Sequence, residues 1–549
     1  MQPRPTPRQQ QRGAALMIML VILIMGVATI LITSLSSTAL KQTQQKTTEA
    51  VLAQAKEALI GYAISYGDTH TGEGYGYLPC PDVNGGNGEG SSPGSSCGTT
   101  EANSIGRLPW RTLDLPTLRA SNGDCLWYAV SGSYKNNPKS ATAMNWDNTG
   151  KLHVFSAEGN EIAANEIVAL VIAPGTVTSS AQDRSGNTAP ICGGNYTASA
   201  YLDNDTLHAI NNAAIATGSF ILPHQHRDAN GNITVQSNDQ ITYITRQDIW
   251  TAIQRRIAKE AKTCLDDYAA SSGGKYPWAV PVSTSTLFTP FITGEYNTRF
   301  GRLPTRPSIQ TEATPADITQ MQQKFSELWL ALETFKANKT SANHSAMRNK
   351  ADAAKDAADN VKDNYDNTPL ENPADALKDA ADNAKDNLNI SSSNTQINAI
   401  QQTILNAANN FVAALASEFS QASGMANTWP GSCTLFSSTR WESWRNLLFY
   451  QVADGYKPGS GASCGNCLSV EGGGHNAAGS GSYRAAVIVA GKQLTANRTP
   501  ANLGDYLEAD NQLPRNDSTK PYKTYHVTDS DYRINNDLVL CLDGRVNCL

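Results

Sequence analysis

The feature that most constrains this chain is an apolar segment close to its amino terminus. The leader Met1–Gly13 contains three arginines and no acidic residue, and the 22 residues of Ala14–Leu35 carry no charge. About 20 predominantly apolar residues can span a bilayer as a helix, and a basic flank favours the cytoplasmic side. No small-x-small cleavage site follows the segment, which distinguishes it from an ordinary secretory signal. The sequence therefore predicts a long transmembrane helix, with most of the chain extracytoplasmic.

The junction of leader and apolar segment, Gly13-Ala14-Ala15-Leu16-Met17-Ile18, resembles the class III signal peptides of type IV prepilins and pseudopilins. In that family a prepilin peptidase cuts after the glycine, so the resemblance implies cleavage between Gly13 and Ala14. Most members have a glutamate as the fifth residue after the cut, where this chain has Ile18. A carboxylate within an apolar segment is costly unless it is neutralised. In lacking it, the chain resembles the K-class tip pseudopilins of type II secretion; an uncleaved single-pass anchor is the alternative.

The resemblance also implies partners and a location. The partners are other minor pilins or pseudopilins, the prepilin peptidase and the inner-membrane assembly platform. The location is the inner membrane of a bacterium as a single-pass protein before assembly, and then a filament tip at the cell surface or in the periplasm. A net charge of -6 offers no electrostatic attraction to nucleic acid, so no nucleic-acid partner is expected.

The segment after the apolar run also has the pattern of a helix. Between Ser36 and Tyr66 there is no proline and one glycine, Gly61, and apolar residues recur at spacings of three and four around Leu52 and Leu59. That spacing is typical of a helix with one buried face. A long helix whose second half packs on a globular head is the architecture of pilins.

Blocks of similar sequence recur in the same order in two parts of the chain, which indicates an internal duplication. The paired blocks are 55–63 and 258–269, Gly-Arg-Leu-Pro at 106–109 and 301–304, 126–130 and 448–452, 167–173 and 485–491, 201–203 and 506–508, and 241–244 and 538–541. Each copy reads as a helix followed by several β-branched strands, which is an α+β layout. We interpret the Gly-Arg-Leu-Pro blocks as turns that pack the helix against the sheet.

The second copy is interrupted by an alanine-rich segment with its own repeat. Residues 351–365 return as 374–388, and Pro369 and Pro373 break the pattern between them. Stripes of small residues in both repeats suit a thin antiparallel helical hairpin. A floppy linker is the alternative, because alanine stripes bury little area. K-class tip pseudopilins also carry a helical insertion, so the resemblance points the same way.

Together these patterns predict an α+β fold: a long N-terminal transmembrane helix with two tandem pilin-like heads, the second carrying an all-helical insertion. The expected parts are a basic leader (1–13), a membrane-spanning and packing helix (14–66), a first head (67–247), the start of a second head (248–310), the helical insertion (311–423) and the remainder of the second head (424–549).

Most of the ten cysteines are expected to form disulfides, because the anchor would deliver them to an oxidising compartment. Cys80 with Cys97 would close a glycine-rich loop, and Cys541 with Cys548 would staple the C-terminal tail. Cys464 and Cys467 form a C-x-x-C, which we also interpret as a disulfide. A zinc site would need further ligands, of which His475 is the one candidate nearby, and a redox motif would need a βαβ context.

Calcium is the one cofactor that the sequence leaves open. Asp529, Asp531 and Asp537 form an oxygen-rich turn, and K-class tip pseudopilins bind calcium. Residues 228–232 have a fainter likeness to a calcium loop but lack the bidentate acid at its end. His224 and His226 would point to one face of a strand. Ordinary turn chemistry explains these oxygen-rich segments without a metal.

The sequence therefore predicts a structural protein: a tip or initiating minor pilin or pseudopilin of a type IV pilus or type II secretion filament, docking through its apolar N-terminal helix. The alternative is a pilus-displayed adhesin that binds a surface ligand through the helical insertion and the second head. An enzyme is not expected, because no nucleophile–base arrangement stands out.

Overall fold

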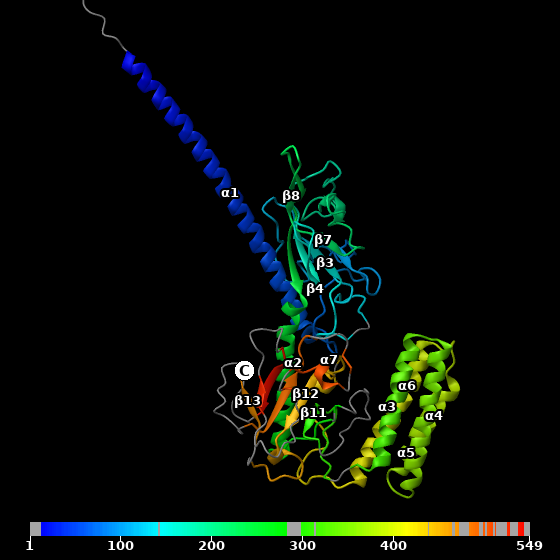
Figure 1. Cartoon of the computed structure of the whole chain (residues 1–549). Helices are drawn as coiled ribbons and strands as arrows, with labels where there is room; N and C mark the ends of the chain where they lie inside the picture. Colours follow the sequence, from blue (N-terminus) through cyan, green and yellow to red (C-terminus); the bar gives the residue numbers. More distant parts are fainter. Residues whose placement is uncertain are drawn as a thin grey trace, which may run out of the picture. The chain divides into compact units, whose positions relative to one another are not determined.

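In the computed structural model, long helices and runs of short strands follow one another in blocks along the chain (Figure 1). The structure describes residues 12–140, 143–280, 282, 298–311, 314–437, 439–463, 467–471, 483–493, 498–499, 502–508, 511, 524–526 and 536–542, with the side chains of the first helix described from Leu40 on. In this part of the chain the α-helices are α1 (Arg12–Thr69), α2 (Arg246–Ser271), α3 (Ala316–Ala337), α4 (Ser341–Asn364), α5 (Glu371–Asn387), α6 (Asn394–Glu418) and α7 (Thr439–Trp444).

The prediction of a transmembrane helix is wrong for the residues that the structure describes. None of their helices is both long and apolar enough to cross a membrane. The side chains of α1, a continuous helix of 58 residues, are described from Leu40 on, beyond the predicted span 14–35, and this part of the helix includes the charged residues Lys41, Lys46 and Glu49. Charged side chains are costly in a hydrocarbon environment. The fold is a mixed α/β one, in which α1 serves as a packing element.

The second half of α1 has one buried face. Side chains at intervals of three and four residues are buried, namely Thr48, Leu52, Ala55, Leu59 and Ala63. The residues from Leu40 to Thr47 are all exposed. This amphipathic pattern is the one that the sequence spacing predicts. The described helix therefore leaves the globular part on the N-terminal side of Thr48.

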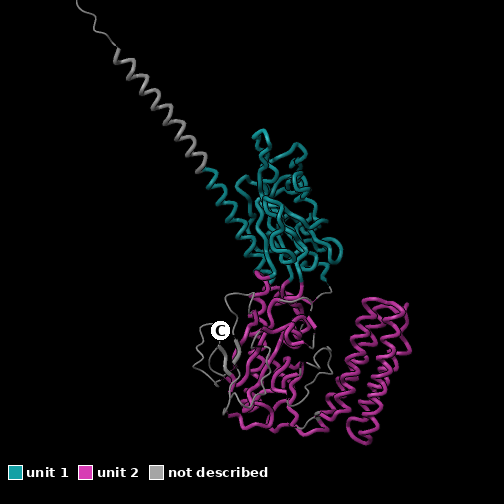
Figure 2. Tube along the Cα trace, viewed as in Figure 1, with its two compact units in different colours: residues 1–63, 77–140, 149–246 teal, residues 64–76, 141–148, 247–549 magenta. Residues whose placement is uncertain are grey.

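The chain divides into two compact units (Figure 2). Unit 1 comprises residues 1–63, 77–140 and 149–246, and unit 2 comprises residues 64–76, 141–148 and 247–549. The division at Arg246 lies next to the predicted boundary between the two heads. Short segments of the first part of the chain belong to unit 2, which the sequence blocks do not indicate.

Unit 1 contains a six-stranded sheet. Its strands run in the order β1 (Ser104–Arg107), β2 (Trp127–Val130), β4 (Glu161–Ala173), β3 (Leu152–Phe155) and β7 (Ser219–Ile221), with β10 (Gln240–Thr245) also paired to β4. All pairs are antiparallel except β3 with β7. Two small hairpins complete the unit, β5 (Asn204–Asp205) with β6 (Ile210–Asn211) and β8 (His224–Arg227) with β9 (Ile233–Ser237).

The centre of this sheet is buried on both faces. All four residues of β2 are buried, and so is β4 from Ile167 to its end at Ala173. Continuous apolar runs of this kind are typical of strands that are covered on both sides. α1 is attached to the unit by polar contacts as well, because Lys56 Nζ donates to the carbonyl of Tyr243 at 3.0 Å.

Unit 2 repeats the helix-and-sheet pattern. Its main sheet has the order β11 (Phe300–Arg302), β12 (Leu448–Val452), β14 (Ala485–Val489) and β16 (Leu538–Leu542), all antiparallel. A parallel pair, β13 (Ser469–Glu471) with β15 (Thr524–His526), lies apart from it. α2 buries Ile249, Trp250, Ile253 and Ile257, and Gln254 on the same helix donates to the carbonyl of Val489 at 2.9 Å.

The registers of the two sheets match at equivalent positions. Tyr128 of β2 pairs with Val171 of β4, and Tyr450 of β12 pairs with Val487 of β14. The hydroxyl of Tyr128 donates to the carbonyl of Pro79, and that of Tyr450 to the carbonyl of Pro277, both at 3.1 Å. The repeated sequence blocks therefore occupy equivalent strands with equivalent hydrogen bonds.

The alanine-rich insertion forms a four-helix bundle, α3–α6, with its own hydrophobic core. The two sequence repeats fall on α4 and α5, and their small-residue stripes are buried in that core. Buried members of the stripes are Ala351, Ala354, Ala358, Val361, Ala374, Leu377, Ala381 and Ala384. At the base of the bundle Gln310 and Gln421 form an antiparallel bridge, so the insertion begins and ends at neighbouring points.

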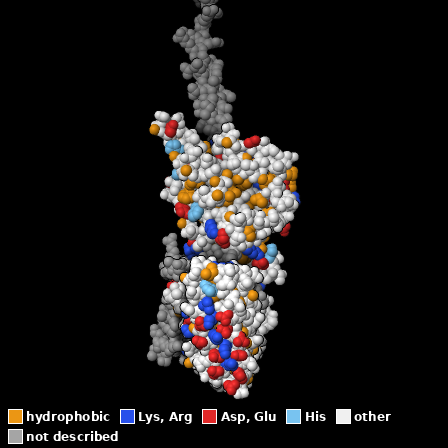
Figure 3. All heavy atoms as spheres, turned by 90° about the vertical axis from the view of Figure 1, so that its right-hand side faces the viewer, with side chains coloured by type: hydrophobic (Ala, Val, Ile, Leu, Met, Phe, Trp, Pro, Cys, Tyr) orange, Lys and Arg blue, Asp and Glu red, His pale blue; other side chains and the backbone are white. Residues whose placement is uncertain are grey.

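The outer face of α4 and α5 carries a ladder of ion pairs. Its four rungs are Lys355–Asp382 at 2.9 Å, Lys362–Asp375 at 3.2 Å, Lys378–Asp359 at 2.6 Å and Lys385–Asp352 at 2.6 Å. Figure 3 shows basic and acidic side chains gathered in a stripe over the bundle. Each rung joins one repeat to the other, because lysine and aspartate alternate on one face of each helix.

Candidate functional site

A buried arginine lies on aromatic rings in each unit. Arg107, at the end of β1, is 2% exposed, and its guanidinium carbon lies 4.8 Å from the ring centre of Tyr201. Its Nη2 donates to the carbonyls of Asn195 at 2.7 Å and Gly193 at 3.0 Å. Cation–π contacts and hydrogen bonds to carbonyls therefore hold the charge inside the unit.

Arg302 occupies the equivalent place in unit 2. Its guanidinium carbon lies 4.8 Å from the ring centre of Tyr506 and 5.1 Å from that of Phe449, and its Nε donates to the carbonyl of Asn446 at 3.0 Å. Burial lowers the pKa of Arg302 to about 10. The arginines of both Gly-Arg-Leu-Pro blocks thus end a strand and pack in the core, so the interpretation of these blocks as turns is incomplete.

Each unit also contains a pair of buried carboxyl groups. In unit 1, Asp239 Oδ2 accepts from the backbone nitrogen of Asp203 at 2.7 Å and from Asn212 Nδ2 at 2.9 Å. Burial, together with the negative charge of Asp203, raises the pKa of Asp239 to about 7. Two close carboxylates in a low dielectric do not ionise together easily, so this pair keeps a proton at pH values above the usual range for an aspartate.

The second pair is Glu508 and Asp537 in unit 2. Asp537 Oδ2 accepts from the backbone nitrogen of Glu508 at 2.9 Å and from Asn511 Nδ2 at 3.1 Å. Burial and the neighbouring charge of Glu508 raise the pKa of Asp537, and burial also raises the pKa of Glu508. The backbone-to-carboxyl and amide-to-carboxyl bonds are the same as those in unit 1, so the carboxyl pair is a duplicated feature.

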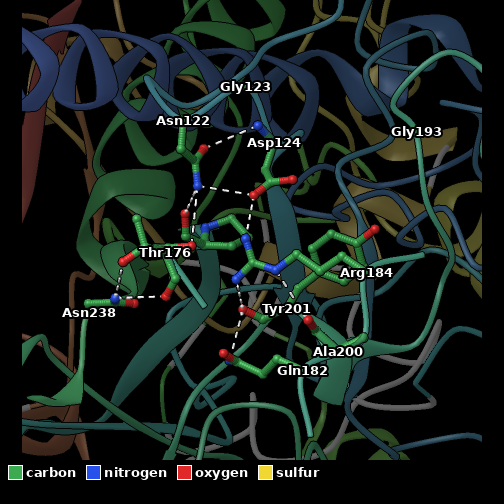
Figure 4. A network of polar contacts seen from close by, with 12 residues as sticks. Asn122, Gly123, Asp124, Thr176, Gln182, Arg184, Gly193, Ala200, Tyr201 and Asn238 are labelled. Atoms are coloured by element: carbon green, nitrogen blue, oxygen red, sulfur yellow. Dashed lines mark hydrogen bonds and ion pairs between the residues drawn. The ribbon is translucent and has the colours of Figure 1, made fainter. Parts of the chain in front are cut away.

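A network of polar contacts around Arg184 links loops of unit 1 (Figure 4). Arg184 pairs with Asp124 at 2.5 Å and donates to the carbonyls of Ala200 at 3.2 Å and Tyr201 at 3.1 Å. The partners come from the loop before β2 and from the segment before β5. All of these partners are groups of the protein, and they come from separate segments. The network therefore connects these loops by hydrogen bonds and an ion pair.

Two histidines and a buried aspartate form a cluster of possible metal ligands in unit 1. Asp205 of β5 is fully buried, and its Oδ2 lies 2.6 Å from His208 Nδ1 and 3.5 Å from His224 Nε2. One donor atom from each residue lies within 4.8 Å of the other two. Imidazole and carboxylate donors in this number suit a divalent metal ion.

Of the predicted metal ligands, the structure describes only one. Asp537 lies in the buried carboxyl pair, whereas Asp529 and Asp531 lie outside the described residues. The fainter candidate, Asp228, makes a tight turn in the β8–β9 hairpin, where its Oδ1 accepts from the backbone nitrogens of Asn230 at 2.9 Å and Asn232 at 2.8 Å. Turn chemistry therefore accounts for this segment.

The other predicted site residues are partly outside the described region. Gly13, Ala14 and Ile18 fall within the helical backbone of α1, but their side chains are not among those described. His224 is buried and belongs to the aspartate–histidine cluster, whereas His226 on the same strand is exposed.

The structure joins Cys80 to Cys97, the pair that the sequence analysis names. It also joins Cys125 to Cys192 and Cys264 to Cys433, which the sequence analysis does not pair. Cys467 and Cys541 are disulfide-bonded as well, and Cys464 and Cys548 lie outside the described residues.

Sequence reasoning missed the aspartate–histidine cluster although it noticed His224. The signal that could have found it is the three-residue spacing of Asp205 and His208, because the short β5–β6 hairpin turns both side chains towards each other.

No family model, curated protein or solved structure matches this chain.

Proposed function

We propose that this chain is a structural subunit: a tip or initiating minor pilin or pseudopilin of a type IV pilus or type II secretion filament. One observation carries the proposal. α1 packs on an antiparallel sheet through the buried face that begins at Thr48, and its preceding turns, Leu40 to Thr47, are exposed. A helix that leaves its own head in this way offers a surface to neighbouring subunits.

The attachment of α1 to unit 1 supports this role. Lys56 is bonded to the backbone of Tyr243 in β10, and Thr48 donates to the hydroxyl of Ser121 at 3.1 Å. Because both contacts join the helix to the sheet-bearing part of unit 1, the helix would transmit a docking event to the head. The proposed partners are other minor subunits, the prepilin peptidase and the assembly platform.

One copy at a filament end fits the proposal better than many copies along its shaft. A single α1 carries two sheet-bearing units and a four-helix bundle, which is a large body to repeat at each step of a helical array. The chain resembles the K-class tip pseudopilins in having Ile18 where most members of the family have a glutamate. This resemblance also favours a position at the filament end. Immunogold labelling along the whole fibre would contradict it.

Processing of the leader tests the proposal directly. With a prepilin peptidase present, mass spectrometry should find a mature chain that begins at Ala14. Gly13→Trp should accumulate as the precursor, because a bulky residue obstructs the cleavage position, whereas Gln10→Trp in the same leader should be processed normally. Recovery of filament-associated protein with an intact Met1 leader would overturn the proposal.

The rival function, display of an adhesin, can be tested by removal of the helical bundle, because the base of the bundle is closed. Thr311 donates to the carbonyl of Ser420 at 3.0 Å, so residues 312–419 can be replaced by a short glycine linker with little strain on the rest. Loss of assembly in this variant would support a tip role for the bundle. Intact assembly with lost attachment to a surface would support the adhesin.

A further inference from the structure

The aspartate–histidine cluster of unit 1 contains a buried nitrogen without a partner. His224 Nδ1 lies 3.1 Å from the carbonyl of Leu222, so Nδ1 carries the proton that this carbonyl accepts. In the neutral ring Nε2 then has a lone pair. Nε2 is buried, has no hydrogen-bond partner, and faces Asp205 Oδ2 at 3.5 Å. Two electron-rich atoms facing each other in a buried place call for a positive charge between them.

The carboxylate of Asp205 is held in place by the backbone of its own hairpin. Its Oδ1 accepts from the nitrogen of Leu207 at 2.8 Å, and its Oδ2 accepts from the nitrogen of His208 at 3.3 Å. Together with the Leu222 carbonyl behind His224, these bonds orient two of the three donors. Such supporting bonds are what metal-ligating histidines and carboxylates have in well-formed sites.

The turn after β3 lies against one part of the cluster. Gly159 in this turn approaches His208 so closely that a Cβ there would lie 2.6 Å from the ring. Glu158, the residue before it, is exposed. The turn therefore restricts the position of the His208 ring and leaves part of its side chain open to solvent.

We propose that Asp205, His208 and His224 bind one divalent transition-metal ion, with zinc as the first choice. The donor set of two imidazoles and one carboxylate is one that zinc accepts. In a tetrahedral site the donor atoms lie about 3.3 Å apart, given bond lengths near 2 Å. The His208–Asp205 separation of 2.6 Å would therefore widen as the ion replaces the proton between these atoms, and the 3.5 Å separation of His224 Nε2 from Asp205 Oδ2 is already close to that value. His208, with a side chain 21% exposed, is the side from which the ion enters.

The site would fasten two hairpins together. Asp205 belongs to β5 and His208 to the turn that follows it, whereas His224 begins β8. Without an ion, the two hairpins already contact each other through the imidazole rings of His208 and His224, whose centres are 5.2 Å apart, and through the hydroxyl of Thr206, which donates to Gln236 Oε1 at 3.4 Å. A bound ion adds direct bonds between them, so the metal has a structural role in this proposal.

Calorimetric titration of the untagged full-length chain tests the site. After removal of metals with a chelator, the protein is titrated with zinc chloride at pH 7, and cobalt(II) is added in a parallel sample. We expect one ion per chain and the visible absorption of tetrahedral cobalt. Binding should weaken in acid, because metal ligands must be deprotonated to bind the ion.

Matched variants identify the ligands. His224→Gln and His208→Gln should each weaken zinc binding by about 100-fold or more, whereas His226→Gln, exposed on the same strand, should bind as the parent does. His208 is the less buried ligand, so its variant keeps the test valid if His224→Gln fails to fold. No uptake of zinc or cobalt by the folded parent, or equal loss in the His226 variant, would overturn the proposal and leave an aspartate–histidine ion pair.

Discussion

The sheets of unit 1 and unit 2 are alike in their interiors and different in their attachments. Both bury an arginine on the ring of a tyrosine, Arg107 in one and Arg302 in the other, and both bury a carboxyl pair. Unit 1 adds small hairpins and the aspartate–histidine cluster, whereas unit 2 adds a helical bundle. The duplicated polar groups therefore belong to the framework, and the new features lie in the connections, where proteins usually vary.

The common interior is informative because its polar groups are costly to bury. A buried charge must be compensated by hydrogen bonds or an opposite charge, and Arg107 finds carbonyls for this purpose. Arg302 meets the requirement with a different carbonyl, that of Asn446, while keeping the tyrosine ring as its aromatic partner. If the two interiors are energetic copies, equivalent substitutions should have equivalent effects, and substitutions in the attachments should not.

The largest expected difference between the units comes from their disulfides. Cys264–Cys433 closes a separation of 169 residues in unit 2, and Cys125–Cys192 one of 67 residues in unit 1. Because longer loops lose more unfolded-state entropy, the double serine variants should lose about 5 and about 4 kcal/mol of stability, respectively. Denaturant unfolding followed by hydrogen exchange in each unit measures both; a greater loss for the shorter loop would contradict the ranking.

The carboxyl pairs should produce a loss of stability as the pH rises. An aspartate with a pKa of about 7 in the fold and about 4 when unfolded binds its proton more tightly in the folded state. Stability is therefore full below pH ~4 and falls as the pH rises towards 7. Asp239→Asn should abolish this fall in unit 1, a difference of up to about 4 kcal/mol at pH 8.

Asp537→Asn should act in the same direction in unit 2, since burial and Glu508 raise the pKa of Asp537. Asp114→Asn, at an exposed position, serves as the control and should leave the pH dependence unchanged. Thermal unfolding between pH 4 and 8, with exchange resolved for each unit, measures the slopes. If the dependence of stability on pH were unchanged in Asp239→Asn, the carboxyl pair of unit 1 would not be its cause.

Replacement of the buried arginines also tests whether the two interiors are equivalent, with a smaller expected loss of stability. Arg107→Met and Arg302→Met keep an apolar stem but leave backbone carbonyls without their charged donors, so each should cost about 3 kcal/mol in its own unit. Arg111→Met is the control, because Arg111 also lies over a tryptophan ring but is exposed. Urea unfolding measures the losses, and strongly unequal effects of the two buried substitutions would show that the interiors are not equivalent.

The ion-pair ladder of the bundle has no counterpart among the described residues of unit 1 and should matter least. Lys355→Asp places two acids opposite each other at Asp382, and the expected cost is about 0.5 to 1 kcal/mol, because both side chains are partly exposed. Lys355→Asp with Asp382→Lys restores the pair in reverse and should recover most of the loss. Salt titration of unfolding is the measurement; equal stability of the single and double variants would mean that this rung contributes nothing.

Much of the repeated framework could be predicted from the sequence, because short-range patterns determine it. The blocks around Tyr128 and Tyr450 indicated equivalent strands, and the three- and four-residue spacing near Leu52 indicated the buried face of α1. The disulfides Cys125–Cys192 and Cys264–Cys433 could not be predicted, since pairing depends on which distant loops meet. The prediction of a transmembrane helix was based on the apolar composition of residues 14–35, and it is wrong for the described residues.

The candidate metal site was beyond sequence reasoning for a similar reason. Asp205 and His224 are brought together only when two hairpins fold towards each other, and neither hairpin has a strong pattern of its own. The buried arginine of Gly-Arg-Leu-Pro was misread because a charged residue beside glycine and proline is typical of a turn. Its aromatic neighbours come from other parts of each unit.

The closed base of the helical bundle has a mechanical consequence. Gln310 and Gln421 are bridged, and Ala422 donates to the carbonyl of Ile309 at 2.8 Å. When the chain is pulled between the first turns of α2 and β12, the tension passes through the Cys264–Cys433 disulfide and bypasses both this bridge and α3–α6. The bundle is then a side branch that bears no load, and only after reduction of the disulfide would the antiparallel bridge be the next element to carry the tension.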